Sequence, residues 1–244
     1  MCLLMKNREV HHNLQEKIKA LKAAFPHTLP VFTGFTFLGI AYGILMNSKG
    51  YGFGWTVLMS VMAFAGSAQY VAINLLTSVF DPLYALLLTL MVNARHLFYG
   101  ISMLDKYQGT GKFKPYLIFG LCDETFSIIC SANPPEGVNR NWFMFFITML
   151  NHSYWVIGSA LGVLLGHMVS FNTKGLDFVL TALFVVIFTG QWKSQANHKP
   201  AVIGVACSVI CLVVFGPDNF IIPSMIAILA ILTMFRKKIG LEDE

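Results

Sequence analysis

Long apolar runs separated by short polar stretches make up most of the chain after residue 26. Each run is close to the ~20 residues that a helix needs to cross about 30 Å of hydrocarbon. The runs are continuous, without the alternation of spanning strands, so their backbones satisfy their hydrogen bonds as helices. The pattern predicts an all-α integral membrane protein of about six to eight transmembrane segments, at about 27–47, 55–80, 82–104, 113–132, 141–168, 175–192, 200–216 and 219–235.

Composition agrees with this prediction. Of the 244 residues, 56% are hydrophobic and 12% are charged, against about 25% charged in an ordinary soluble domain. No stretch between the runs is long enough for a soluble domain. We expect a transporter-like membrane domain over 27–236 and a cytoplasmic tail over 237–244.

The first 26 residues are too polar for a secretory signal peptide. Apolar residues recur there at helical spacing with lysines between them, which predicts a basic amphipathic helix on the cytoplasmic membrane surface. A solvated tail is the alternative, because polar residues dilute the pattern. The apolar positions are Val10, Leu14, Ile18, Leu21 and Phe25.

The distribution of Lys and Arg predicts the topology. If all eight segments crossed, Lys106, Lys112 and Lys114 would lie outside. If instead 55–80 and 175–192 dip into the membrane and return, bending at 65–69 and near 180–184, that loop moves inside. Six true spans then remain with both termini cytoplasmic, and only Lys49 and Arg140 lie outside.

This scheme contains an inverted repeat, in which 27–47 with 55–80 runs opposite to 141–168 with 175–192. Small residues support it weakly, since "GIAYG" at 39–43 matches "GSALG" at 158–162. Small residues at this spacing also occur simply because they let helices pack closely. Inverted repeats with interrupted helices are common in secondary transporters, where the substrate site lies at mid-membrane.

Charged residues inside apolar segments are the strongest functional signal. Arg95 lies in one predicted segment, and Asp123 and Glu124 lie near the middle of the next. An isolated charge at the bilayer centre costs about 2.5–3.5 kcal/mol on insertion scales, so an ion pair is expected. Neighbouring helix positions diverge by about 100°, so one acid pairs with Arg95 and the other is left as a proton carrier or a partner for a substrate ammonium group. The alternative is that both acids only lock two helices together.

Other polar groups add candidate contacts. A helix break at Gly66 and Ser67 exposes amides that bind a carboxylate, and Gln69 adds neutral donors and acceptors. Asn93 joins these residues and Glu124 as a predicted substrate contact. His96 is either a pH-responsive group beside Arg95 or an ordinary hydrogen-bonded histidine. A small-residue packing face is the alternative for the break.

No cofactor or metal site is predicted. The five cysteines form no CxxC pair and are read as free packing residues, and no nucleotide-binding glycine loop or nucleic-acid signal is found. A membrane enzyme and an ion channel are the competing classes. Known catalytic motifs and a ring of filter groups are missing from the sequence, which disfavours both.

Four motifs in order resemble the AzlC-type permeases, the large subunits of two-component branched-chain amino acid exporters. They are "GSAQY" (66–70), "NARHLFYG" (93–100), "DETF" (123–126) and "GLDFVLTALFVV" (175–186). The resemblance implies a multi-pass protein of the cytoplasmic membrane that exports valine, leucine, isoleucine or other apolar amino acids together with a small AzlD-type subunit. Without an ATP site, an ion gradient is the expected energy source; the acids and His96 favour protons, and sodium is the alternative.

Overall fold

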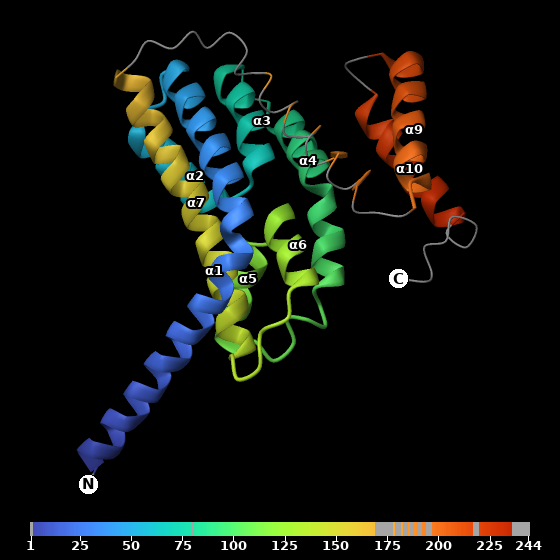
Figure 1. Ribbon diagram of the computed structural model, residues 1–244. Coiled ribbons are helices and arrows are strands. Elements are labelled where there is room, and N and C mark those ends of the chain that lie inside the picture. Colours follow the sequence, from blue (N-terminus) through green and yellow to red (C-terminus); the bar gives the residue numbers. More distant parts are fainter. Residues whose placement is uncertain are drawn as a thin grey trace. The chain divides into compact units, whose positions relative to one another are not determined.

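The computed structural model describes residues 2–79, 81–168, 197–216 and 220–235, with isolated positions between 178 and 193. It divides into two compact units, 1–179 and 180–244, which are considered separately. The described elements are helical (Figure 1). In the first unit they are α1 (Cys2–Ser48), α2 (Phe53–Ala63), α3 (Gly66–Thr77), α4 (Pro82–Ser102), the 3₁₀ turn η1 (Gly111–Phe113), α5 (Lys114–Phe119), α6 (Asp123–Ser131) and α7 (Arg140–Met168).

Helix α1 runs without interruption from Cys2 to Ser48 and includes Pro26 and Pro30. The predicted amphipathic segment 1–26 is therefore the first part of the same helix as the first span. Its position at a membrane surface stays a prediction. By length and composition, Leu14–Ser48 and Pro82–Ser102 are the described helices able to cross a membrane.

Helices α1 and α7 pack side by side in the same direction. Thr28 of α1 contacts Tyr154 of α7, and residues later in α1 contact residues later in α7. Glycines make this approach possible, because a Cβ on Gly43 would collide with the Ser159 carbonyl and one on Gly162 with the Ile40 carbonyl. The close-packing interpretation of "GIAYG" and "GSALG" is thus confirmed. The prediction that 141–168 runs opposite to 27–47 is wrong.

Helices α2 and α3 form the first hairpin, which enters beside the end of α1 and returns. Phe64, after α2, meets Phe35 in the middle of α1 with ring centroids 6.2 Å apart. On the way back, the Tyr70 hydroxyl donates to Leu38 O and the Tyr51 hydroxyl to Leu76 O. The chain is non-helical at Phe64 and Ala65, so the predicted bend in segment 55–80 is confirmed.

Helices α5 and α6 form a second hairpin that enters from the opposite end. The ring of Phe113 lies 4.7 Å from that of Trp142 near the start of α7, and Phe119 reaches His152. The chain is then non-helical over residues 121–122, and α6 returns to place Ile129 O beside Lys106. The prediction that 113–132 is one crossing helix is wrong. The turn η1 leads into α5, which ends at Phe119, and the chain turns back after Gly120.

Helix α4 connects the two hairpins and runs antiparallel to α1, from Pro82 to Ser102 (Figure 1). The structure therefore contains an inverted pair, in which α1 with the first hairpin corresponds to α4 with the second. The predicted second half of the repeat included 175–192 with a bend near 180–184, and this segment lies largely outside the described residues.

The observed topology gathers more of the basic residues at one end of the protein than the predicted topology does. Arg140 donates to Lys106 O and therefore lies at the lysine-rich end. The prediction had placed Arg140 at the other end, with Lys49. Of the Lys and Arg residues between positions 14 and 168, Lys49 lies at the opposite end and Arg95 lies midway. The basic end carries Lys17, Lys19, Lys22, Lys106, Lys112, Lys114 and Arg140. The positive-inside rule would favour a cytoplasmic location for so basic an end.

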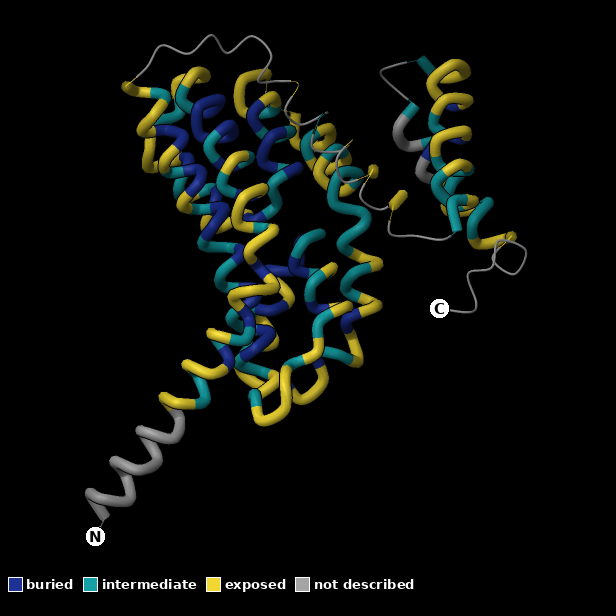
Figure 2. The backbone as a smooth tube through the Cα atoms, in the orientation of Figure 1, coloured by how far each residue is buried: buried dark blue, intermediate teal, exposed yellow. Residues whose placement is uncertain are grey.

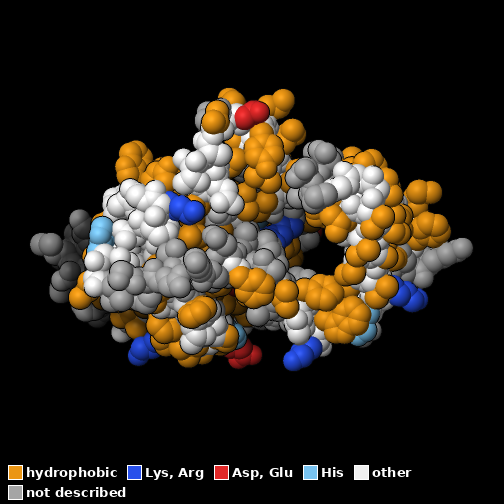
Figure 3. All heavy atoms as spheres, turned by 90° about the horizontal axis from the view of Figure 1, so that it is seen from above, with side chains coloured by type: hydrophobic (Ala, Val, Ile, Leu, Met, Phe, Trp, Pro, Cys, Tyr) orange, Lys and Arg blue, Asp and Glu red, His pale blue; other side chains and the backbone are white. Residues whose placement is uncertain are grey.

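Burial is concentrated where α1, α2, α3 and α7 meet (Figure 2). Helix α4 has no buried residue within the described part of the chain and exposes many leucines. Hydrophobic side chains also cover much of the surface in the view of Figure 3. Such an apolar exterior is expected of a protein whose solvent is lipid.

In the second unit, α9 (Lys199–Phe215) packs against α10 (Ile221–Met234). Cys207 and Cys211 are buried, and together with Cys122 and Cys130 they are free thiols. The prediction of unpaired cysteines is confirmed for these four. Gly216 ends α9 with φ of +75°, a value that favours glycine.

Candidate functional site

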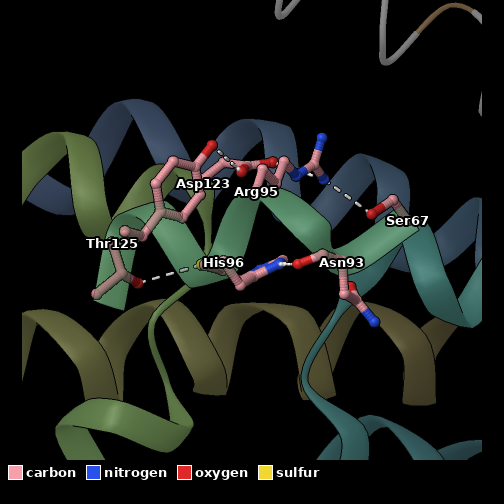
Figure 4. Close-up of polar contacts among 8 residues, drawn as sticks. Ser67, Asn93, Arg95, His96, Asp123 and Thr125 are labelled. Carbon is pink, nitrogen blue, oxygen red and sulfur yellow. Dashed lines mark hydrogen bonds and ion pairs between the residues drawn. The ribbon is translucent and has the colours of Figure 1, made fainter. Parts of the chain in front are cut away.

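Arg95 joins the tips of the two hairpins. Its Nη2 lies 2.9 Å from Oδ2 of Asp123, at the start of α6, and donates a 2.9 Å hydrogen bond to Oγ of Ser67, at the start of α3. Figure 4 shows the guanidinium between these two side chains. The predicted pairing of Arg95 with an acid of the following segment is confirmed.

Asp123 is the acid that pairs. Its Oδ1 also accepts a 2.7 Å hydrogen bond from the Tyr99 hydroxyl, one turn beyond Arg95 on α4. The pair is largely shielded, with side-chain exposures of 29% for Arg95 and 16% for Asp123. Glu124 is the next residue and does not share the ion pair. The structure thus identifies Asp123 as an acid that pairs with Arg95, and the role expected of Glu124 stays a prediction.

Both acids occupy the first turn of α6, which has no side-chain cap. A helix N-terminus carries partial positive charge, so carboxylates there are stabilised. Asp123 is thus held by the helix end and by Arg95 together. Glu124 shares the same helix end.

The "GSAQ" residues divide into two environments. Ser67 contacts Arg95, whereas Gln69 is 1% exposed, accepts from Trp155 Nε1 at 2.6 Å and lies 3.5 Å from Ser60 Oγ. Its amide is engaged by neighbours in the packed interior. Gly66 lies against Trp155, where an added Cβ would come within 3.0 Å of the ring.

A cavity of about 450 Å³ lies between the two hairpin tips and α4. Its volume falls in the range of small-molecule sites, about 300–1,000 Å³. Its polar lining residues are Thr89, Asn93 and His96, and its apolar ones include Phe64, Leu90, Leu97, Ile118, Phe119 and Leu121. Arg95 and Asp123 lie outside the lining, so the ion pair holds the tips beside the cavity and does not form its wall.

Two hydrogen-bonding features of the cavity are unfilled. The side-chain oxygen of Asn93 is buried without a partner among the described residues. Ala65, the N-cap of α3, lines the cavity, and this helix end has no side-chain cap. The first amides of a helix have no partner within it. The Asn93 oxygen and the beginning of α3 at Ala65 therefore border one apolar space.

His96 lies in the cavity wall, with Nδ1 3.2 Å from the carbonyl of Asn93 and its ring against Tyr99. The predicted substrate contact Asn93 and the predicted pH-responsive residue His96 thus reach the cavity. Gln69 is in the packed interior, and Gly66 and Ser67 contact protein groups through Trp155 and Arg95. Glu124 follows Asp123 behind the lining. Their roles stay proposals.

Sequence analysis missed the contacts that α7 makes with the tips. Asn151, 0% exposed, donates to Thr125 Oγ1 at 3.1 Å, and His152 Nδ1 lies 3.1 Å from the Tyr116 hydroxyl. Trp155 packs on the first tip at Gly66 and donates to Gln69. The sequence does contain a sign of these contacts, the polar triplet "NHS" at 151–153 within an apolar run. Such a triplet predicts that this part of the helix faces polar groups of the protein.

Comparison with known proteins assigns the family. The chain is 58% identical to the "Branched-chain amino acid transport protein AzlC" of Bacillus subtilis, over 93% of this chain and 90% of that protein. It is 44% identical to an uncharacterized membrane protein of Haemophilus influenzae, covering 88% and 89% of the two chains. The inner membrane protein YgaZ of Escherichia coli is 26% identical over 75% of this chain and 78% of its own.

No solved structure matches the chain. The descriptions of the relatives as membrane proteins agree with the membrane location that the composition predicts. The family of AzlC proteins matches residues 30–169, a range that contains both hairpins, α4 and nearly all of α7. From this match and the relatives together, the chain belongs to the AzlC family.

Proposed function

We propose that this protein is a secondary transporter that exports branched-chain or other apolar amino acids across the cytoplasmic membrane. The observation that carries the proposal is the apolar cavity between two hairpin tips, bordered by an unfilled acceptor and an uncapped helix N-terminus. The Bacillus subtilis relative, a branched-chain amino acid transport protein by name, supports the same substrate class.

A zwitterionic amino acid fits these groups in one orientation. Its carboxylate binds the first amides of α3 around Gly66 and Ser67, because the N-terminus of a helix attracts anions. Its ammonium group donates to the Asn93 side-chain oxygen. Its side chain lies among Phe64, Phe119 and the leucines, where a charged or strongly polar side chain would lose its hydration.

The hairpins provide the barrier on either side of the substrate. They enter from opposite ends and meet halfway along α7, with Arg95 fixing one tip to the other. Withdrawal of one tip at a time would open the cavity to one side, which is alternating access around a fixed site. Arg95 is a positioning residue in this mechanism, since it holds Ser67 and Asp123 and does not line the cavity.

Proton flow is the proposed energy source. Glu124 is the proposed carrier because it lies next to the ion pair without sharing it. Protonation would remove its charge from the first turn of α6 and weaken the attraction between tip and helix end. A small AzlD-type membrane subunit is the proposed partner, and both termini are proposed to be cytoplasmic.

Flux measurements test the proposal. The protein is co-purified with the small hydrophobic gene product encoded beside it, reconstituted in proteoliposomes, and assayed for release of labelled valine, leucine and isoleucine under a pH gradient, with glutamate and lysine as controls. Gradient-dependent release of the apolar amino acids alone is expected. Release that ignores the gradient would remove proton coupling, and no release of any apolar amino acid would overturn the function.

Asn93→Leu sharpens the test at the cavity. Leucine has similar volume but no acceptor, so the KM for valine should rise by about tenfold, corresponding to one lost hydrogen bond of about 1.4 kcal/mol. Leu97→Met, on the apolar wall of the same helix, is the matched control and should change the KM by less than about threefold. An unchanged KM in Asn93→Leu would contradict the assigned orientation.

A further inference from the structure

His152 occupies a place on α7 that mirrors Arg95 on α4. Its ring meets Phe64, of the first tip, at 4.5 Å and Phe119, of the second hairpin, at 5.7 Å between centroids. Both phenylalanines line the cavity. Arg95 and His152 therefore each contact both hairpins, from the two long helices on either side of them.

Polar contacts of His152 also reach both hairpins. Nδ1 lies 3.1 Å from the hydroxyl of Tyr116 on α5. The carbonyls of Ser60 and Val61, in the last turn of α2, lie near the ring, but Nε2 is buried without a regular hydrogen bond in the described part of the protein. The last carbonyls of a helix lack partners within it, and such an end attracts a donor or a cation.

We propose that His152 is a second positioning residue of the transport cycle, which couples the C-terminal end of α2 to α5 through Tyr116. The inference rests on the proposed transport function. With Arg95 joining α3 to α6 and His152 joining α2 to α5, all four short helices are tied across the cavity. Withdrawal of one tip then requires a change at His152 as well as at Arg95.

A small movement completes the link. When a hairpin tip shifts toward the ring, Nε2–H of His152 can donate to a carbonyl of α2 while Nδ1 accepts from Tyr116. Within the described structure, Tyr116 on α5 is the titratable group that faces the ring of His152. Helix α2 presents backbone carbonyls to the ring, and Phe64 packs on it. The link therefore depends on hydrogen bonding more than on an ion pair.

Two variants test the link. Tyr116→Phe removes the hydroxyl and keeps the ring that packs on Phe145 and Phe119. His152→Phe keeps a planar ring and removes both nitrogens. Each should lower the maximal transport rate of the co-purified complex by about tenfold with KM within about twofold, and the double variant should match the worse single variant, because all three break one link. Ser153→Ala, whose hydroxyl bonds only to Met149 O among the contacts described, is the matched control.

A second readout separates this inference from the transport function. Backbone hydrogen exchange at residues 60–66 and 119–123 should become faster in Tyr116→Phe, with exchange in the α1–α7 glycine contact unchanged. If wild type carries no amino acid but the exchange difference is seen, the transport function fails and the link stands. A normal rate in both variants, a rise in KM alone, or a rate loss equal to the loss of folded protein would each overturn the positioning role.

Discussion

The two hairpins share an outline but carry different chemistry. The first presents neutral groups, Ser67 and Gln69, and its tip is packed on Trp155 of α7. The second presents two acids, Asp123 and Glu124, in the first turn of α6. Its helices are also shorter, with 6 and 9 residues against 11 and 12. In the proposed mechanism this difference divides the work: the first hairpin binds the substrate carboxylate, and the second carries the proton.

This comparison depends on the two hairpins entering from opposite ends of the protein. Cysteine labelling tests that arrangement and gives an all-or-none result. Single cysteines at Lys49 and Arg140, in a background without native cysteines, are exposed to an impermeant thiol reagent. Lys49→Cys should react from outside the cell and Arg140→Cys only after the membrane is opened, because Arg140 lies with the lysine-rich end. Lys112→Cys is the control for the cytoplasmic end. Reaction of Arg140→Cys from outside would restore the crossing segment 113–132.

The largest effect on transport is expected for Arg95, which contacts both hairpins. Arg95→Ala leaves Asp123 without its cation and Ser67 without its donor, so transport should fall by at least about 100-fold. Folded protein should also decrease, since breaking a shielded pair costs about 3 kcal/mol, the lower end of the usual range because the pair is partly exposed. Arg95→Lys keeps the charge but loses the planar guanidinium whose Nη2 contacts both Ser67 and Asp123, and should recover only part of the activity. Normal flux in Arg95→Ala would contradict its positioning role.

The two acids of the second hairpin should then separate. Asp123→Asn loses the ion pair and should reduce both folded protein and transport, by about tenfold or more. Glu124→Gln should fold normally and retain flux at one pH. In wild type, proton entry from outside makes export rise as the outside pH falls; Glu124→Gln should lose this rise. Flux against outside pH in proteoliposomes is the measurement. Equal, mild effects in both variants would remove the division of roles.

Sequence patterns predicted the parts of the fold that depend on burial of long apolar runs. The bend at 65–69 was visible because Gly66, Ser67 and Gln69 interrupt an apolar run, and the pairing of Arg95 followed from the cost of an isolated charge. The second bend was missed because "FGLCD" at 119–123 has one glycine and no polar group before Asp123. Apolar residues at a turn that is buried in protein look like residues of a spanning helix.

The direction of α7 could not be predicted either. The prediction took 113–132 as a crossing helix, which put Arg140 outside, and one arginine in a short loop is too weak a signal to correct that. The cavity depends on how two tips meet across the membrane, which no local pattern records. Of the proposed contacts, Asn93 and His96 reach the cavity because α4 turns one face to it, while Arg95 and Tyr99 on the next face hold Asp123.

The smallest effects concern how tightly each tip packs on α7. A Cβ on Gly120 would collide with the Thr148 methyl group, whereas one on Gly66 would lie 3.0 Å from the Trp155 ring. Gly120→Ala should therefore cost about 1–3 kcal/mol of stability and Gly66→Ala less, seen as the lower thermal unfolding temperature of the purified complex. Thr148→Ser removes that methyl and keeps the hydroxyl bond to Met144 O, so it should restore the stability of Gly120→Ala and leave Gly66→Ala unchanged. Rescue of both glycine variants, or of neither, would show that the second tip is not seated against Thr148.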